Sequence, residues 1–139
     1  MKKLLVLLFF SVLFSAVKVS AYSPWLKLNK IYNATTLVYD GKKVPYNGAI
    51  CMANINGTNT IIIKGVDEDE KLSWTLRLKS DFKRDSTDDG DTVYIAQEQN
   101  KTGVLIGTWP GGKRIILFDF EGENLGVIFD STPFSDLND

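Results

Sequence analysis

The chain has 139 residues and is almost neutral, with 16 lysines and arginines, 17 aspartates and glutamates, one cysteine and no histidine. The lack of histidine excludes Ser-His-Asp and Cys-His nucleophile systems and the usual catalytic zinc sites, because each needs a nitrogen ligand or a group that titrates near neutral pH. A single cysteine excludes thiolate clusters and dithiol redox motifs. We therefore expect a protein that is not an enzyme, with no catalytic residues, no metal site and no cofactor.

The first 21 residues have the three parts of a secretory signal peptide. Lys2 and Lys3 form a charged start, an apolar run extends from Leu4 to Val17, and Val19-Ser20-Ala21 supplies the small residues of a cleavage site. At about 1.5 Å per helical residue, this run is too short to cross a hydrocarbon core of about 30 Å. We therefore expect cleavage after Ala21, a secreted or periplasmic location, and no membrane insertion after cleavage.

Residues 22–139 are expected to form a single domain, because 118 residues suffice to bury one hydrophobic core. Removal of residues 1–21 leaves 13 basic and 17 acidic residues, a net charge of −4. No basic face is concentrated in the sequence, so a nucleic-acid partner is not expected, and the mild acidity argues against binding to anionic membranes. The expected partner is a protein or a small ligand.

Apolar residues occupy every second position along most of this domain, which is the pattern of half-buried β-strands. The most regular example is residues 71–79, where Leu72, Trp74, Leu76 and Leu78 share one face. No stretch has the 3.6-residue period of an amphipathic helix, so parallel sheets built from βαβ units are not expected. In chain order, the predicted strands span residues 26–32, 35–39, 49–55, 60–64, 71–79, 91–97, 102–109, 113–120 and 124–130.

Short turns separate these strands. Asn, Asp and Gly accept the positive φ angles of tight hairpin turns, so neighbours in sequence should pair as antiparallel neighbours in space. The predicted fold is all-β, a single antiparallel meander of about eight or nine strands that closes as a small barrel, with a two-layer β-sandwich as the alternative. The apolar run 115–118 predicts a strand covered on both faces, by a terminal segment or a dimer partner. The turn positions are Asp40-Gly41, Asn47-Gly48, Asn56-Gly57, Asp89-Gly90, Gly111-Gly112 and Gly122.

Cys51 is expected to be buried as a free thiol. Alternation places it on the same strand face as Ala49 and Ala53, a small-residue lining typical of a buried cysteine. An intermolecular disulfide is the alternative. With one cysteine, no intrachain disulfide supports the fold.

Two acidic segments lie between predicted strands. Residues 85–91 have the alternating oxygen donors that open a calcium-binding loop, but Ala96 stands where the loop needs a bidentate carboxylate. We therefore predict a solvated hairpin tip there and no metal site. The other segment, Asp67 to Glu70, is interpreted as a solvated loop, with docking of a basic partner as the alternative.

The turn from Trp109 to Arg114 is the predicted binding surface. It combines an aromatic residue and two cations with flexible glycines, and tryptophan and arginine are enriched at binding hot spots. The predicted binding residues are therefore Trp109, Lys113 and Arg114. The alternative is that Trp109 packs into the core and that the two cations are ordinary surface residues.

Two further patterns allow other interpretations. Asp119 and Glu121 are spaced to share a strand face, which would suit the carboxylate pair of a glycoside hydrolase. The alternative is that they are two solvated carboxylates near a hairpin. Asn33, Asn56 and Asn100 each begin a glycan acceptor pattern, which matters only in a eukaryotic source, whereas the Met-Lys-Lys start is more typical of bacteria.

These observations favour an exported, non-catalytic β-barrel or sandwich binding module, such as a protein inhibitor or an immunity-type protein. The first alternative is a structural or self-assembling cell-surface protein. The second is a hydrolase that uses carboxylates alone. Because one fold hosts many functions, the site has to decide between them.

Overall fold

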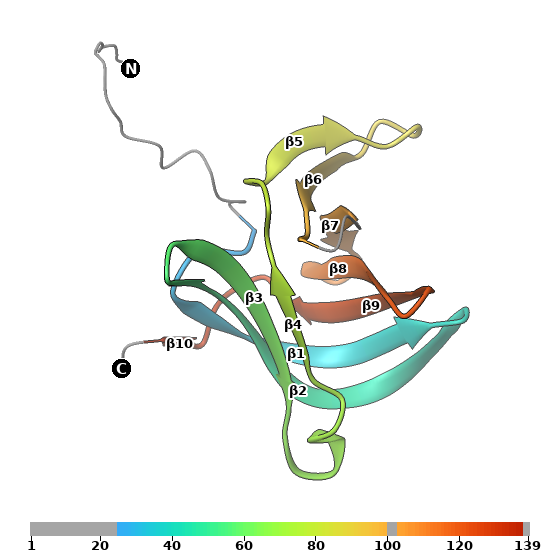
Figure 1. Cartoon of the computed structure of the whole chain (residues 1–139). Coiled ribbons are helices and arrows are strands. Elements are labelled where there is room, and N and C mark those ends of the chain that lie inside the picture. Colours follow the sequence, from blue (N-terminus) through green and yellow to red (C-terminus); the bar gives the residue numbers. More distant parts are fainter. Residues whose placement is uncertain (1–24, 100–102, 138–139) are drawn as a thin grey trace.

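The computed structural model describes residues 25–99 and 103–137, which form a strongly curled β-sheet (Figure 1). No helix in these residues has the length and apolar character needed to cross a bilayer. The elements in chain order are β1 (Lys30–Tyr39), β2 (Lys42–Ile55), β3 (Thr58–Gly65), the 3₁₀ helix η2 (Asp67–Asp69), β4 (Trp74–Arg77), β5 (Lys83–Ser86), β6 (Thr92–Gln97), β7 (Gly103–Trp109), β8 (Lys113–Phe120), β9 (Glu123–Asp130) and β10 (Ser135–Asp136).

Two-residue turns set the pairing of three hairpins. In each of the pairs Asp40-Gly41, Asn56-Gly57 and Glu121-Gly122, both residues have a positive φ angle. This is the backbone conformation of type I′ turns, whose twist matches that of the adjoining strands. The turns join β1 to β2, β2 to β3, and β8 to β9, which confirms the predicted hairpins at these positions.

The strand order in the sheet is β4-β3-β2-β1-β9-β8-β7-β6-β5, and β10 pairs with β1. The chain thus makes two meanders, β1 to β4 and β5 to β9, and the pairing of β1 with β9 joins them. Each of these strand pairings is antiparallel. The prediction of an all-β fold with a single antiparallel sheet is confirmed.

The end of β4 and the residues after it contact the residues that follow β6. Leu78 forms an antiparallel bridge with Glu98, and the Gln99 N–H donates to the Arg77 carbonyl at 2.8 Å. The strands β4 and β5 do not pair with each other, so hydrogen bonds do not close the sheet completely. The sheet therefore has ten strands instead of eight or nine. It is not closed by hydrogen bonds as the predicted barrel would be, and this fits either an open barrel or the sandwich alternative.

The predicted turn at Asn47-Gly48 is wrong. These residues lie inside β2, at a β-bulge opposite Ala34 and Thr36 of β1. A Cβ atom on Gly48 would lie only 2.4 Å from the Tyr46 ring, so the glycine permits a close approach of side chain and backbone. The bulge bends β2 and helps to curl the sheet.

Other strands also differ from the prediction: β2 begins at Lys42 instead of residue 49, and β10 was not predicted. β1 is one continuous strand where two were expected, at 26–32 and 35–39. β4 is shorter than the predicted strand at 71–79, because the chain between η2 and Trp74 is a turn and loop, although Leu76 and Leu78 are buried as expected. β5 was missed because its four residues are all polar and exposed.

The hydrophobic core lies on the inner face of the curled sheet. Apolar residues also occupy the outer face of β8, where Ile115 is buried but Leu117 is 37% exposed. The run 115–118 is thus apolar on both faces, yet Leu117 remains open to solvent. The largest fully buried core side chains are Tyr32, Phe118, Phe129, Leu26, Ile50, Met52, Ile61, Ile63, Ile106, Ile116, Val104 and Val127.

One end of this core is covered by the segment that precedes β1. Leu28 pairs with Met52 of β2, and Trp25 packs edge-on against Tyr94 of β6 with ring centroids 4.9 Å apart. Between them, Leu26 is fully buried. This segment therefore crosses the inner face from β2 to β6, and we call the end that it covers the closed end.

Candidate functional site

The opposite end of the core lies at the tips of two hairpins, and the strand register places its side chains. In one row across the sheet, Phe118 of β8 lies opposite Leu125 of β9, and Leu125 lies opposite Tyr39 of β1. In the next row toward the tip, Phe120 lies opposite Glu123. Residues in register share one face, so these five side chains belong to the inner face.

Aromatic side chains form an exposed surface at this end. Trp74 of β4 packs against Phe118 and Phe120 of β8, with ring centroids 5.8 and 6.4 Å apart. Because β4 and β8 are not adjacent in the sheet, these contacts cross the inside of the curled sheet. Phe120 is nevertheless 44% exposed and Tyr39 is 38% exposed. We define the open end as Tyr39, Asp40, Trp74, Phe120 and Glu123.

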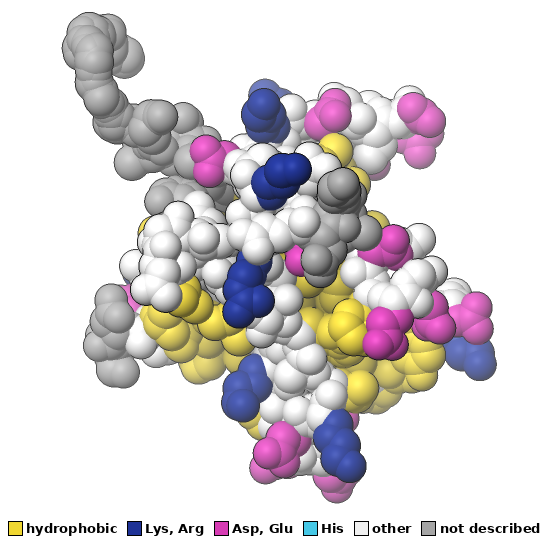
Figure 2. Space-filling view, viewed as in Figure 1, with side chains coloured by type: hydrophobic (Ala, Val, Ile, Leu, Met, Phe, Trp, Pro, Cys, Tyr) yellow, Lys and Arg dark blue, Asp and Glu magenta, His cyan; other side chains and the backbone are white. Residues whose placement is uncertain are grey.

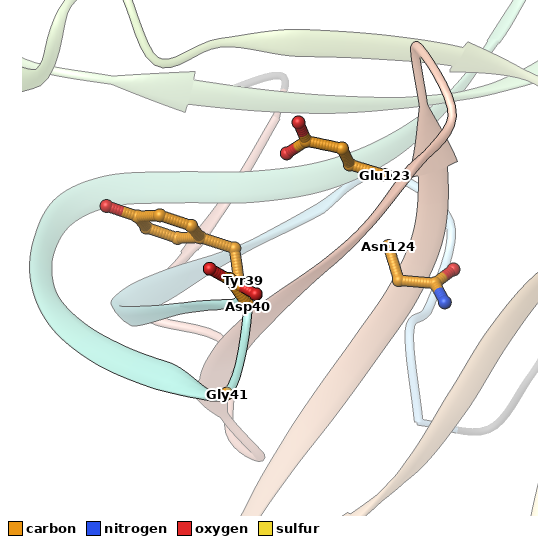
Figure 3. A pocket seen from close by; sticks show the side chains of 5 residues that line it. All are labelled: Tyr39, Asp40, Gly41, Glu123 and Asn124. Carbon is orange, nitrogen blue, oxygen red and sulfur yellow. The ribbon is translucent and has the colours of Figure 1, made fainter.

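A hollow of about 730 Å³ lies at the two hairpin tips, lined by Tyr39, Asp40, Gly41, Glu123 and Asn124. Figure 3 shows the Tyr39 ring and the Glu123 carboxylate extending to the same side, whereas the Asn124 side chain points away. The hollow therefore presents an aromatic ring together with two carboxylates.

The carboxylates of the hollow have no cationic partner within the described chain. Neither Asp40 nor Glu123 forms an ion pair with another described residue. Lys42 lies opposite Tyr39 but forms no ion pair with either carboxylate. The Lys43 ammonium lies over the Trp109 ring, 5.6 Å from its centroid. The open end is therefore locally acidic.

Apolar and acidic side chains lie side by side on the surface at this end. Figure 2 shows apolar side chains at the surface between β4 and the tips of the β1–β2 and β8–β9 hairpins, with acidic side chains next to them. Tyr39, Leu72 and Phe120 are exposed apolar residues at this end. Exposed aromatic groups next to carboxylates suit the binding of a partner, because the rings offer area for burial and the carboxylates select charge.

Tyr46 of β2 fixes the position of the segment that contains Trp74 at the open end. Its ring centroid lies 6.4 Å from that of Trp74, and its hydroxyl donates to the Leu72 carbonyl. Burial, assisted by the charge of Asp69, raises the pKa of Tyr46 to about 12. The hydroxyl therefore stays protonated at neutral pH and keeps the Leu72–Trp74 segment against β2.

The structure does not bring the predicted binding residues Trp109, Lys113 and Arg114 onto one surface. Trp109 and Lys113 are cross-strand partners, and Lys113 forms an ion pair with Asp130. Arg114 lies on the opposite face of β8, at the closed end, with its guanidinium 4.8 Å from the Trp25 ring centroid and its Nε atom buried without a hydrogen bond. Both cations of this turn are therefore engaged within the molecule.

The other acidic groups are placed separately. Asp119 is exposed on β8, and Glu121 lies in the following turn with a φ angle of 53°, so the two do not share a strand face. Residues 85–91 are exposed, and no three His, Cys, Asp or Glu side chains in the described part of the chain could hold a metal ion together. The second acidic segment forms η2, which is tied to β2 by a hydrogen bond from the Asn47 N–H to Asp69.

Cys51 is buried, with 8% of its surface exposed, as its alternation with small residues predicted. Burial raises the pKa of its thiol, which keeps the thiolate scarce at neutral pH. Asn33 and Asn56 are exposed. Asn100 and the predicted signal peptide, residues 1–21, lie outside the described residues.

The sequence analysis missed the open end, although its turns were predicted. Tyr39 and Glu123 flank the turns at Asp40-Gly41 and Gly122, and the pairing of β1 with β9 brings these turns together. The available signal was composition, because acidic residues adjoin an aromatic residue at both tips.

Comparison of the chain with known proteins finds no matching family model, no matching curated protein and no matching solved structure. The functional argument therefore rests on the geometry of the open end.

Proposed function

We propose that the protein is an exported, non-catalytic binding module that contacts another protein through the open end. Export rests on the signal pattern of residues 1–21. The absence of histidine and the separation of Asp119 from Glu121 support a binding role over a catalytic one. A protein of this kind would act by occupying its partner, as inhibitors and immunity-type proteins do.

The exposure of Phe120 and Tyr39 on the inner face carries this proposal. Large aromatic side chains on the inner face of a curled sheet are expected to be buried, as Phe118 and Phe129 are. At the open end, Tyr39 instead lines a hollow whose carboxylates form no ion pair with a described residue, and Phe120 lies opposite one of them, Glu123. Aromatic residues on a rigid sheet are efficient binding anchors, because little conformational entropy is lost when they are buried.

A matched pair of variants tests the proposal. Tyr39→Ser removes an aromatic side chain that is 38% exposed at the open end, whereas Leu117→Ser removes an apolar side chain that is 37% exposed on the outer face of β8. We expect Tyr39→Ser to lose a partner that wild-type protein captures from an extract of the cell envelope, and Leu117→Ser to retain it. Loss with Leu117→Ser alone would move the binding surface to the outer face.

The outer face supports a second candidate, a self-assembling surface protein. Ile95, Leu105 and Leu117 line a shallow hollow of about 260 Å³ there, together with Gly103. Exposed apolar sheet faces promote association. Under this candidate, sedimentation of the wild-type protein shows oligomers that grow with concentration, and Leu117→Lys remains a monomer.

A further inference from the structure

We propose that the partner inserts a basic side chain, lysine or arginine, into the hollow of the open end. This inference rests on the proposed function and specifies the partner. The ammonium or guanidinium group would lie between Asp40 and Glu123, and the apolar stem of the side chain would pack on Tyr39 and Phe120.

The balance of charge at the two hairpin tips supports a cationic occupant. Residues 39–43 and 119–124 together contain four carboxylates, Asp40, Asp119, Glu121 and Glu123, against two lysines. One of these lysines, Lys43, lies over the Trp109 ring. The remaining excess of negative charge attracts a cation and repels an anionic partner.

The composition of the hollow suits both parts of a long basic side chain. Lysine and arginine place an apolar stem along hydrophobic surface while the charged head reaches polar groups. Here, Glu123 lies directly opposite Phe120 across the β8–β9 pair, so an apolar surface and a carboxylate are adjacent. The face of Tyr39 adds a further attraction for a cation.

The occupant also has to fit beside Lys42. This residue lies opposite Tyr39 across the β1–β2 pair, and its exposed ammonium makes no ion pair with a described carboxylate. Its charge opposes a cationic ligand. Removal of the Lys42 charge should therefore strengthen the binding of a cationic ligand, whereas removal of a carboxylate of the hollow should weaken it.

Titration of the isotope-labelled protein with pentalysine, followed by amide NMR, tests the proposal. We expect pentalysine to shift the amide signals of residues 39–43 and 119–124, and pentaglutamate to leave them unchanged. Glu123→Gln should weaken pentalysine binding about fivefold, in line with about 1 kcal/mol for an exposed charge pair. Lys42→Gln should strengthen it by a similar factor.

Asp119→Asn is the matched control, because it removes the same charge from the same hairpin. Asp119 lies opposite Asn124, whose side chain points away from the hollow (Figure 3). We expect this variant to bind pentalysine almost as the wild-type protein does. Equal weakening by Asp119→Asn and Glu123→Gln, or no shift with pentalysine, overturns the cationic occupant. Failure of the open end as a binding surface is recognised separately, by retained partner capture in Tyr39→Ser.

Discussion

The closed and open ends of the core are built from similar residues but have different surroundings. At the closed end, Tyr32 and Phe129 pack with ring centroids 5.7 Å apart, both are buried, and the Tyr32 hydroxyl contacts the segment that contains Leu26. At the open end, Trp74 and Phe120 also pack together, yet Phe120 remains 44% exposed. Aromatic packing thus stabilises the fold at one end and leaves a surface at the other.

The covering segment explains this difference. It is fixed by a hydrogen bond from the Asn29 N–H to the Met52 carbonyl at 2.7 Å and by another from the Lys27 N–H to the Tyr32 hydroxyl at 2.9 Å. No described segment crosses the open end in the same way. If the comparison is correct, substitutions at the closed end reduce stability, and substitutions at the open end reduce binding.

The largest effect is expected for Phe129→Ala. The side chain is fully buried against Tyr32, so its loss should lower the free energy of unfolding by about 3–5 kcal/mol. Denaturant unfolding of the variant and the wild-type protein measures this change. A loss below about 1 kcal/mol would show that the closed end is not tightly packed.

The next effect is expected for Leu26→Ala, which tests whether the covering segment is part of the fold. Truncation of this buried side chain should cost about 2–4 kcal/mol. It should also expose Trp25, seen as faster quenching of tryptophan fluorescence. Lys27→Ala is the control, because the Lys27 side chain is exposed and its backbone contact remains. If Leu26→Ala unfolds at the same denaturant concentration as Lys27→Ala, the segment contributes nothing to the closed end.

Tyr46→Phe tests whether Tyr46 fixes the Leu72–Trp74 segment at the open end. The variant should lose about 1 kcal/mol of unfolding free energy, because the hydrogen bond to the Leu72 carbonyl is lost. The effect depends on pH. The pKa of Tyr46 is about 12 in the folded protein and 10.0 ordinarily. A raised pKa contributes stability below pH 10 that is lost as the pH rises through about 12.

Unfolding measurements at several alkaline pH values check this dependence. The wild-type protein should lose stability over this range, and Tyr46→Phe should lose less. An identical pH profile for the two proteins would show that the Tyr46 hydroxyl is not held in the folded state.

The smallest effect is expected at the ion pair between Lys113 and Asp130, whose side chains are each 36% exposed. Asp130→Asn should change the free energy of unfolding by less than about 1 kcal/mol, because solvent screens the pair. Unfolding at low and high salt should give nearly the same difference from the wild-type protein. A loss of several kcal/mol in the free energy of unfolding would show that solvent does not screen this pair.

Alternation and turn residues were sufficient to predict the strands from β6 to β9 and three of the hairpins. They could not predict β5, because Lys83 to Ser86 contain no apolar residue, and its strand conformation comes from pairing with β6. Asn47-Gly48 was mistaken for a turn because a bulge and a turn both favour glycine. Local pattern therefore predicted most of the strands, whereas β5 and the bulge in β2 depended on tertiary contacts.

The candidate site was less predictable than the fold. Trp109, Lys113 and Arg114 were adjacent in sequence, but alternation along β8 directs Lys113 and Arg114 to opposite faces. The open end is formed by the pairing of β1 with β9, which joins residues 86 to 95 positions apart in the chain. A local sequence pattern cannot predict a contact between residues so far apart in the chain.

Phe120→Ala tests the central claim most directly, through unfolding and partner capture measured on the same variant. We predict a loss of about 1 kcal/mol or less in the free energy of unfolding, because the exposed ring contributes mainly its contact with Trp74. We also predict that the variant no longer captures the partner. A loss of stability as large as that of Phe129→Ala, together with normal capture, would contradict the account, because Phe120 would then belong to the folded core and not to a binding surface.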